Sequence, residues 1–271
     1  MTLDQGAPRV SPLELGSGVP LLRFANLQAH ARRLRHGIFT REGGVSAPPF
    51  ASLNVSYSVA DDRAAIGENR ARCASALGLT STRIVCAGLV HGTGAARVEA
   101  GDGTLLPDGS RVVQDVDVLL TSTPGIGLLI TAADCLQVLL YDPLTPAVGI
   151  AHAGWCGLAA GVLTAAVAGM GVHFGTVPAR ILAGIGPGLG PCCARFSDPM
   201  RELPPWFAPY IHENHVDLRS AARDQLVGAG LASAGIAQHA ICTVCERARF
   251  FSHRGDRGRT GRFAAIVALS A

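Results

Sequence analysis

Two histidines and one cysteine stand at the ends of apolar segments that are typical of β-strands. His91 follows the segment 84–90, Cys135 lies shortly after the segment 127–131, and His152 comes 17 residues after Cys135. Rigid strands commonly present chemical groups at their ends and in the loops that follow them. Two imidazoles and one thiolate suit Zn²⁺, and three protein ligands leave the fourth position of a tetrahedral ion open. If the fold brings these side chains together, the sequence predicts a catalytic metal site.

The same residues are also consistent with a second chemistry. Cys135 would act as a nucleophile if His91 or His152 accepted the proton of its thiol, as in cysteine hydrolases. Asp134 would point away from such a site, because alternate side chains of an extended segment face opposite sides. Both chemistries require the thiolate, so the spacing alone does not separate a metal ligand from a nucleophile.

Composition narrows the classes of protein to which the chain can belong. It has 271 residues, 48% of them hydrophobic, which is enough for a large core. The formal net charge is only +3 and the arginines are scattered, so we expect binding to neither nucleic acid nor membranes. Neither a membrane-spanning run nor a secretory signal is recognisable. A cytoplasmic protein is therefore predicted, in which the eight cysteines are thiols or metal ligands rather than disulfides.

The sequence contains no lysine, so the 23 residues counted as lysine or arginine are all arginine. This excludes a lysine Schiff base and the phosphate-binding lysine of a P-loop. Phosphate would have to be bound by arginine, backbone N–H groups or a metal. Arg41, Ser46 and Asn54 lie in a segment rich in glycine and hydroxyl groups, and Arg254 lies in the arginine-rich segment 250–262. Both segments are candidate anion-binding loops, although each pattern is also typical of an ordinary surface loop.

The remaining cysteine patterns are weak as metal motifs. Cys192 and Cys193 are adjacent, and because neighbouring cysteines rarely bind one ion together, we predict a buried thiol pair. Cys242 and Cys245 form a C-x-x-C pair, but a zinc ribbon requires a second such pair, which the sequence lacks. We therefore assign this pair a structural role. The glycine-rich segment 184–190 does not complete the G-x-G-x-x-G spacing, so a tight, packed loop is predicted there.

The order of the predicted elements favours one α+β domain with a large mixed sheet over a doubly wound fold. Residues 1–18 are polar and contain proline and glycine, which predicts a flexible tail before a single domain over residues 19–271. A helix is predicted from an N-cap at Asp61 or Asp62 to Leu77. The patterns also predict a strand over 112–121, a helix over 157–170, a helix over 219–235, and strands over 240–242 and 249–252.

Together these segments make the sequence similar to one family, the YfiH-like or laccase-domain (polyphenol oxidase-like) proteins. The resemblance extends from residue 37 to residue 269. Many matches in the same order are more specific than any single motif. The matching stretches are Thr40-Arg41-x-Gly43-Gly44-Val45-Ser46, Ser52-Leu53-Asn54, Val90-His91-Gly92, Thr131-Ala132-Ala133-Asp134-Cys135, Ala151-His152-Ala153-Gly154-Trp155, and residues 68–70, 117–121, 184–187, 242–243 and 250–262.

The resemblance implies a fold, a cofactor and an activity. The fold would be a single-domain, four-layer α/β/β/α sandwich with mixed sheets. His91, Cys135 and His152 would be catalytic and would bind zinc beside a pocket. The implied activity is phosphorolysis of adenosine, inosine, guanosine and methylthioadenosine, with deamination of adenosine. Some bacterial relatives are linked to peptidoglycan editing, so an amidase that acts on a cell-wall precursor is the alternative. Copper fits less well, since the paired H-x-H motifs of multicopper enzymes are absent.

One departure from the family pattern bears on the predicted site. Family members carry arginine after the Trp of the His-Ala-Gly-Trp motif, whereas this chain has Cys156. If that arginine binds a substrate anion, activity would be weaker or altered. A Cys156 thiolate that reached the metal would close the site as Cys₂His₂, an arrangement typical of structural zinc, and would make the protein non-catalytic. We favour the simpler expectation that Cys156 packs at the start of a helix.

Overall fold

The computed structural model describes residues 14–16 and 18–271. Residues 14–16 belong to the segment predicted as a tail, but they form a strand that pairs antiparallel with the next one. Residues 1–13 and 17, which complete the predicted tail apart from residue 18, lie outside the described part of the chain.

The larger sheet has eight strands in the spatial order β1-β2-β3-β16-β9-β4-β7-β6. The C-terminal strand β16 lies at its centre and runs antiparallel to both β3 and β9. The sheet is mixed, because β4 pairs parallel with β7 and with β9. Its strands are β1 (Glu14–Gly16), β2 (Val19–Leu22), β3 (Leu34–Phe39), β4 (Ile84–Gly88), β6 (Thr104–Leu105), β7 (Arg111–Gln114), β9 (Gly127–Ala132) and β16 (Phe263–Leu269).

The second sheet has six strands in the order β15-β12-β10-β11-β8-β5. An antiparallel hairpin of β10 and β11 forms its centre, and Gln137 faces His152 in the register of that hairpin. Its strands are β5 (Ala95–Arg97), β8 (Val118–Thr121), β10 (Leu136–Asp142), β11 (Ala147–Ala153), β12 (Leu182–Ile185) and β15 (Ile236–Gln238). A small separate sheet joins β13 (Ile211–His212) to β14 (His215–Val216).

The predicted helix after residue 61 is present and starts at an N-cap. Asp62 accepts hydrogen bonds from the backbone N–H groups of Ala64 and Ala65, which the first turn of the helix leaves without internal partners. The helices are α1 (Ala25–Gln28), α2 (Arg63–Ala76), α3 (Trp155–Ala160), α4 (Val162–Phe174), α5 (Pro199–Glu202) and α6 (Leu218–Gly228), with short 3-10 helices at Ser81–Arg83, Pro178–Arg180, Pro205–Tyr210 and Ser233–Gly235.

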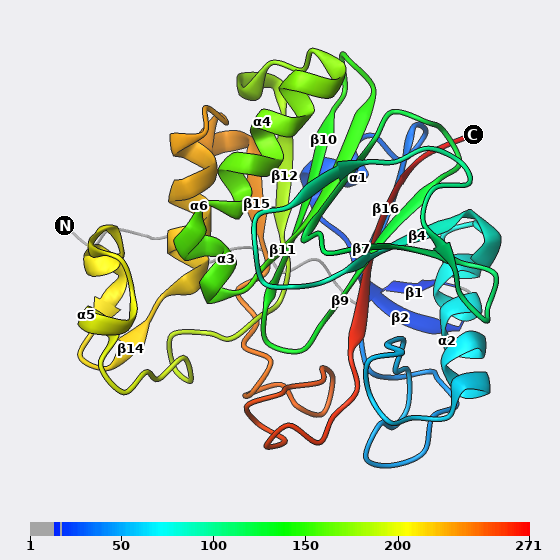
Figure 1. Cartoon of the computed structure of the whole chain (residues 1–271), viewed down its shortest axis with the longest axis horizontal. Coiled ribbons are helices and arrows are strands. Elements are labelled where there is room, and N and C mark those ends of the chain that lie inside the picture. The colour runs from blue at the N-terminus through cyan, green and yellow to red at the C-terminus, as the bar shows by residue number, and fades with distance from the viewer. Residues whose placement is uncertain (1–13, 17) are drawn as a thin grey trace.

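Three hydrophobic cores separate four layers of secondary structure. One core fills the space between the two sheets. The second lies between the six-stranded sheet and helices α3, α4 and α6, and the third lies between the eight-stranded sheet and α2. Figure 1 shows α4 and α6 on one side of the strands and α2 on the opposite side. The predicted α+β fold, a single-domain α/β/β/α sandwich with mixed sheets, is confirmed.

The chain crosses from the larger sheet to the smaller one at three places, between β4 and β5, between β7 and β8, and between β9 and β10. The single strand predicted over 112–121 is therefore wrong. β7 ends at Gln114, and β8 begins at Val118 in the other sheet. Asp115 makes the turn between them with a φ of 59°. Gln114, Asp115 and Asp117 are polar and mark the crossing, but the valines and leucines on both sides of them made one long strand the simpler interpretation of the pattern.

Two predicted helices are shorter than their patterns indicated. Gly161 has a φ of 89° and separates α3 from α4, which interrupts the helix predicted over 157–170. The helix predicted over 219–235 ends at Gly228. The strands predicted over 240–242 and 249–252 are also wrong, because these residues form loops and turns, with only an isolated bridge between Gly188 and Cys242. The second of these segments leads into His253 and Arg254, which line the pocket described below.

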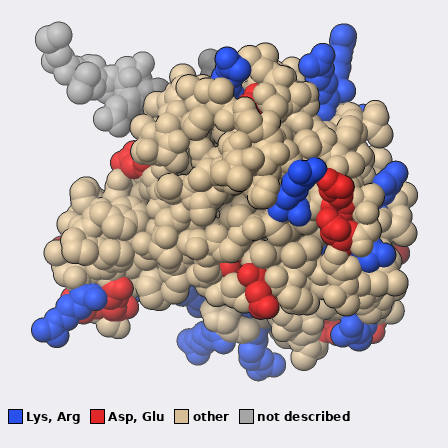
Figure 2. All heavy atoms as spheres, turned by 45° about the horizontal axis from the view of Figure 1, so that its top comes forward, with Lys and Arg blue, Asp and Glu red and all other residues tan. Residues whose placement is uncertain are grey.

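Charged side chains are sparse on the surface, in line with a composition that is 16% charged. On the face shown in Figure 2, arginines and acidic residues lie singly or in small groups among uncharged residues. None of the helices in the described residues combines the length and the apolar character needed to span a membrane.

Candidate metal centre and its pocket

The predicted site residues meet where the chain passes between the sheets. His91 lies in the crossing from β4 to β5, Cys135 ends the crossing from β9 to β10, and His152 lies in β11. The donor atoms of these three residues, here called the pocket triad, lie within 4.8 Å of one another. The rings of His91 and His152 have centroids 4.9 Å apart and stand at 78°, so they approach from different directions. His152 is buried, Cys135 is half-buried and His91 is exposed.

Each crossing contains one residue other than glycine in the left-handed backbone region. These are His91 with a φ of 60°, Asp115 with 59° and Asp134 with 89°. Steric repulsion from a side chain disfavours this backbone conformation by on the order of 1–3 kcal/mol. The conformation persists only where surrounding contacts hold it. Two buried carboxylates, from Asp117 and Asp134, supply such contacts.

Asp117 connects the first and second crossings to the pocket triad. Its carboxylate accepts hydrogen bonds from the backbone N–H groups of His91 at 3.1 Å and Gly92 at 2.7 Å. It also lies 2.8 Å from Nδ1 of His152. Because a carboxylate only accepts, this contact places the ring proton on Nδ1 and leaves Nε2 available as a ligand, as in carboxylate–histidine–metal arrangements. Asp117 was not predicted as a site residue, although it begins the stretch 117–121 that matches the family pattern.

Asp134 fixes the third crossing from the opposite side. Its carboxylate accepts hydrogen bonds from the hydroxyls of Thr243 and Ser252, both at 2.6 Å, and from the backbone N–H of Arg254 at 2.7 Å. Its carbonyl accepts the N–H of Leu189 at 2.7 Å. Asp134 thus holds two distant loops against the strand end that carries Cys135, and it acts as a positioning residue.

The protonation of Cys135 and His152 is coupled. Burial by itself would raise the pKa of Cys135, but the charge of His152 and hydrogen bonds from both triad histidines lower it to about 6. Burial would lower the pKa of His152, but the Cys135 charge and hydrogen bonding to Asp117 raise it to about 9. Between these values the metal-free protein contains a thiolate beside an imidazolium, so the thiolate needed for metal binding or nucleophilic attack is present at neutral pH.

The lowered pKa of Cys135 predicts how the metal-free protein reacts with iodoacetamide. The alkylation rate at Cys135 should rise about tenfold per pH unit below its pKa of about 6 and level off above it, because the thiolate is the reactive form. Peptide mass spectrometry follows each cysteine separately. Cys156 serves as the internal control, since burial and the Cys135 charge raise its pKa. An ordinary thiol profile at Cys135 would contradict the coupling.

Gly154 lies against two members of the pocket triad, Cys135 and His91. A Cβ atom at this position would lie 2.9 Å from Sγ of Cys135 and 3.2 Å from Cδ2 of His91. A side chain here would therefore displace the thiol and one imidazole from each other. The donor distances within the triad fit a small ion, and glycine at position 154 avoids crowding two of the three donors.

Gly154→Ala should weaken metal binding by at least ~10-fold, the scale seen when ligand orientation is disturbed. The affinity is measured by competition with a chelator, and folding is checked by urea unfolding. Gly228→Ala is the matched control, because a Cβ at Gly228 would meet no atom within 4 Å. If both variants bound metal as the parent protein does, the space beside Gly154 would have no role in holding the ion.

The pocket triad forms part of the wall of a cavity of about 420 Å³. Cavities of ~300–1,000 Å³ are typical of small-molecule sites. The wall combines apolar surface from Trp155, Leu189 and Leu218 with the cationic side chains of Arg254 and Arg262. Burial lowers the pKa of Arg262, while the nearby charges of Cys135 and Asp134 raise it in part. The other lining residues are Ser58, Leu89, Thr131, Ala132, Ala133, Asp134, Gly154 and His253.

Of the four residues predicted to bind substrate or phosphate, Arg254 lines this cavity. Arg41 donates hydrogen bonds to the carbonyls of Ala51 and Arg247, and its guanidinium lies 4.5 Å from the Phe251 ring centroid. The hydroxyl of Ser46 accepts a hydrogen bond from an asparagine amide inside the protein.

Asn54 is buried, and its side-chain oxygen accepts the backbone N–H of Arg262 at 2.9 Å. Its amide nitrogen donates to Asp61 at 2.8 Å. Asn54 therefore supports the backbone beside the cavity through Arg262, and Arg41, Ser46 and Asn54 all make hydrogen bonds within the protein.

Cys156 is half-buried in the first turn of α3. In the described residues, the triad donors form a group that does not include the Cys156 thiol. A tetrahedral ion held by these three donors would keep a fourth position for a ligand from the cavity that they line. This favours an open site over the closed Cys₂His₂ arrangement of a non-catalytic protein.

The remaining cysteine patterns do not behave as the sequence suggested. Cys192 is exposed and Cys193 is half-buried, so the predicted buried thiol pair is wrong. Both lie close to Cys242 and Cys245, about 50 residues away in the chain, with all four sulfur atoms within 4.8 Å of one another. No local spacing in the sequence connects the two pairs, which were therefore predicted as separate features.

A family model and several relatives of known name match this chain over most of its length. A family model described as multi-copper polyphenol oxidoreductase laccase matches residues 35–270. Purine nucleoside phosphorylase YlmD of Geobacillus stearothermophilus is 38% identical over 242 residues, covering 85% of this chain and 88% of that protein. A purine nucleoside phosphorylase of Deinococcus radiodurans is 35% identical over 260 residues, covering 93% of this chain and 94% of that protein.

Solved structures share the same fold. The crystal structure of YlmD from Geobacillus stearothermophilus has a TM-score of 0.86 at 33% identity and covers 98% of this chain and 100% of that one. The structure of the hypothetical protein YfiH from Bacillus licheniformis has a TM-score of 0.85 at 33% identity, covering 96% and 100%.

Proposed function

Because the chain belongs to the multi-copper polyphenol oxidoreductase laccase family, and relatives at 31–40% identity are named purine nucleoside phosphorylases, we propose that it is a zinc-dependent purine nucleoside phosphorylase. Its substrates are adenosine, inosine, guanosine and methylthioadenosine, and it also deaminates adenosine. The observation that carries this proposal is the convergence of His91, Cys135 and His152 in the wall of one cavity. We place the enzyme in the cytoplasm.

Zinc suits the donor set better than copper. His91, Cys135 and His152 would hold the ion, with Asp117 orienting His152. Mononuclear copper sites with two histidines and one cysteine commonly add a weak axial methionine. Among the described residues that line the cavity there is no methionine. When bound at such a site, zinc polarises a substrate oxygen or lowers the pKa of a water molecule.

The cavity wall supplies the other groups that the reaction needs. Arg262 and Arg254 are the cations that hold phosphate against C1′ of the ribose, where an arginine fork matches two phosphate oxygens. Trp155, which is 41% exposed, offers an aromatic face to the purine. In phosphorolysis a phosphate oxygen bonds to C1′ as the bond from C1′ to the purine nitrogen breaks. The electron pair of that bond stays on the base, which takes up a proton.

Arg262→Gln tests this assignment of the phosphate site. A hydrogen bond between charged partners contributes ~1.5–3 kcal/mol, so KM for phosphate should rise by about 10- to 100-fold while KM for the nucleoside changes little. Arg259→Gln, in the same loop but exposed, is the matched control. Initial rates at varied phosphate separate the two constants. Equal effects of the two substitutions on KM for phosphate would remove Arg262 from the phosphate site.

A product assay tests the proposed activity itself. Zinc-loaded protein is incubated with adenosine, with and without phosphate, and products are separated by chromatography. Adenine and ribose 1-phosphate should form only with phosphate, whereas inosine should form in both reactions because water replaces the amino group. A Cys135→Ala sample provides the background. Absence of purine base above that background would overturn the proposed phosphorylase.

A second function, an amidase that acts on a cell-wall precursor, is favoured by one specific observation. Cys135, His152 and Asp117 form a thiol–imidazole–carboxylate series, with His152 Nδ1 2.8 Å from the carboxylate. The same series can activate a cysteine nucleophile without a metal. Metal-free protein is the sample that separates the two functions. Turnover of a peptidoglycan precursor by that sample, with an acyl adduct on Cys135, would favour the amidase over the phosphorylase.

A further inference from the structure

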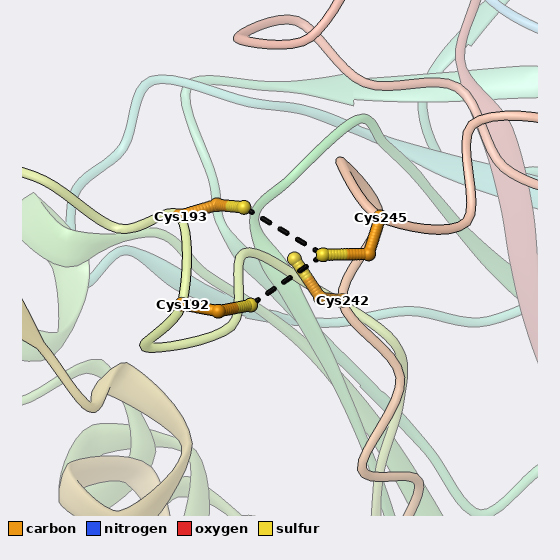
Figure 3. A group of neighbouring side chains, drawn as sticks. All are labelled: Cys192, Cys193, Cys242 and Cys245. Atoms are coloured by element: carbon orange, nitrogen blue, oxygen red, sulfur yellow. Dashed lines mark hydrogen bonds between the residues drawn. The ribbon is translucent and has the colours of Figure 1, made fainter.

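Four cysteines outside the pocket triad converge from two loops. Cys192 and Cys193 lie on one turn, and Cys242 and Cys245 lie on another, with their side chains directed toward a common centre (Figure 3). The sulfur of Cys245 lies 3.6 Å from that of Cys192 and 3.7 Å from that of Cys193. All four sulfur atoms fall within 4.8 Å of one another. This set is named the four-cysteine group below.

The spacing of the sulfur atoms matches a tetrahedral metal site. Zinc–sulfur bonds of ~2.3 Å place two thiolates of a tetrahedron ~3.8 Å apart, whereas a disulfide requires ~2.05 Å. The two measured distances, 3.6 and 3.7 Å, lie close to the tetrahedral value and far from a bond. We propose that the four-cysteine group is a second metal site, which binds one Zn²⁺ through four thiolates.

The local backbone explains how adjacent cysteines reach one centre. The N–H groups of Cys193 and Ala194 both donate to the carbonyl of Gly190 at 2.9 Å, which closes a tight turn. The N–H of Gly190 donates to Sγ of Cys242 at 3.4 Å. A Cβ at Gly190 would lie 2.9 Å from Cβ of Cys242 and 3.4 Å from Sγ of Cys192. Glycine therefore allows the first loop to approach the second at the distance that a shared ion requires.

Nearby arginines fit the charge of such a site. Four thiolates around Zn²⁺ carry a net charge of −2, which is costly to hold unless cations lie near it. Arg219 is buried, donates to the carbonyl of Ile241 at 3.2 Å, and interacts electrostatically with Cys192 and Cys242. Arg254 donates to the carbonyl of Cys193 at 3.3 Å. Arg219 is therefore the cation beside two of the sulfur atoms, while Arg254 contacts the backbone of the first cysteine turn.

The proposed ion would brace the wall of the catalytic cavity. Thr243, inside the C-x-x-C segment, donates its hydroxyl to Asp134. Leu189, just before the other cysteine turn, donates its N–H to the carbonyl of Asp134, and the N–H of Thr243 donates to the carbonyl of Gly188 at 3.0 Å. One ion held by both turns thus fixes the contacts that position the strand end at Cys135. With four protein ligands it has no open position, so its role is structural.

Metal analysis of the purified full-length protein tests this site. The parent protein should contain two zinc ions per chain, Cys193→Ser one, and Cys135→Ala one, because each variant loses a different ion. The double variant should contain none. Cys156→Ser is the matched control and should keep both ions, since its thiol belongs to neither group. The readout is metal content, so a protein inactive on nucleosides would still reveal the second site.

X-ray absorption on Cys135→Ala examines the proposed site with all four of its cysteines intact. This measurement can therefore be made even if Cys193→Ser fails to fold. The expected spectrum has four sulfur neighbours at ~2.3 Å around zinc. A single zinc in the parent protein that Cys193→Ser retains would overturn the proposal. A disulfide from Cys245 to Cys192 or Cys193 in protein purified under reducing conditions would overturn it as well. Iron in place of zinc would overturn the choice of ion.

Discussion

Cys135→Ala is expected to abolish nucleoside phosphorolysis, with kcat/KM at least about 10³-fold lower, equivalent to ~4 kcal/mol of transition-state stabilisation. The substitution removes the only thiolate of the pocket triad and leaves two imidazoles, which bind zinc weakly on their own. Both the activity and one equivalent of bound zinc should disappear together. Initial rates and metal content are measured on the same sample.

The matched control for this substitution is Cys156→Ala. Cys156 is half-buried and lies close enough to Cys135 to feel its charge, but it is not a member of the pocket triad. It should keep its zinc and most of its activity. Equal losses in the two variants would show that the effect comes from disturbing α3 and the cavity wall, and not from loss of a ligand.

Asp117→Asn should lower zinc affinity at the pocket triad by about 10- to 100-fold, the usual effect of removing a carboxylate that orients a histidine ligand. Asp117 is completely buried and accepts three backbone N–H bonds from residues 90–92 in addition to its contact with His152. An amide would place its own N–H group against one of these donors, at a cost of ~1–3 kcal/mol in the free energy of unfolding. Chelator competition and urea unfolding measure the two effects separately.

Asp142→Asn is the control for a buried carboxylate away from the site. Asp142 lies at the other end of β10 from Cys135 and accepts the N–H groups of Leu144 and Thr145. Asparagine can keep both hydrogen bonds, because both donors contact the same oxygen, so this substitution should leave zinc affinity unchanged. A normal zinc affinity in Asp117→Asn would mean that His152 is oriented without help from that carboxylate.

The fold class could be predicted from the sequence because local patterns and burial agree over most of the chain. Asp62 begins α2 where the capping pattern indicates, and the apolar segments near residues 84, 127 and 136 are strands of the cores. The crossing at Asp115 was not predictable in the same way. Buried strands of two packed sheets carry the same apolar residues, so hydrophobicity does not say which sheet a strand joins.

The pocket triad was identifiable because its three residues follow strand-like segments and have side chains suited to a metal. Asp117 was missed because it lies inside the single strand predicted over 112–121. Its contacts form only because the chain crosses between the sheets from β7 to β8. The four-cysteine group was missed for a related reason. Its two halves come from loops that meet across the fold, where Gly188 pairs with Cys242 and Gly190 donates to the Cys242 sulfur. Tertiary contacts of this kind leave no periodic trace in a sequence.

The loops proposed to bind phosphate were the least predictable part of the site. Arg41 and Arg262 occur in similar glycine-rich, arginine-containing segments and both donate to backbone carbonyls, yet Arg262 lines the cavity and Arg41 does not. An arginine in a loop can satisfy its five N–H donors with carbonyls as readily as with phosphate. The choice depends on where the loops fold back, which side-chain composition does not specify.

The dependence of phosphorolysis on the metal of the pocket triad is the most direct test of the proposed catalytic site. Zinc is removed with a chelator, and the release of ribose 1-phosphate from inosine and phosphate is followed before and after zinc is returned. We predict that activity is lost when the zinc of the pocket triad, the ion that Cys135→Ala lacks, is removed. Activity should return when one equivalent of zinc is bound there again. Full activity in the metal-free protein would contradict the assignment of His91, Cys135 and His152 as a catalytic zinc site.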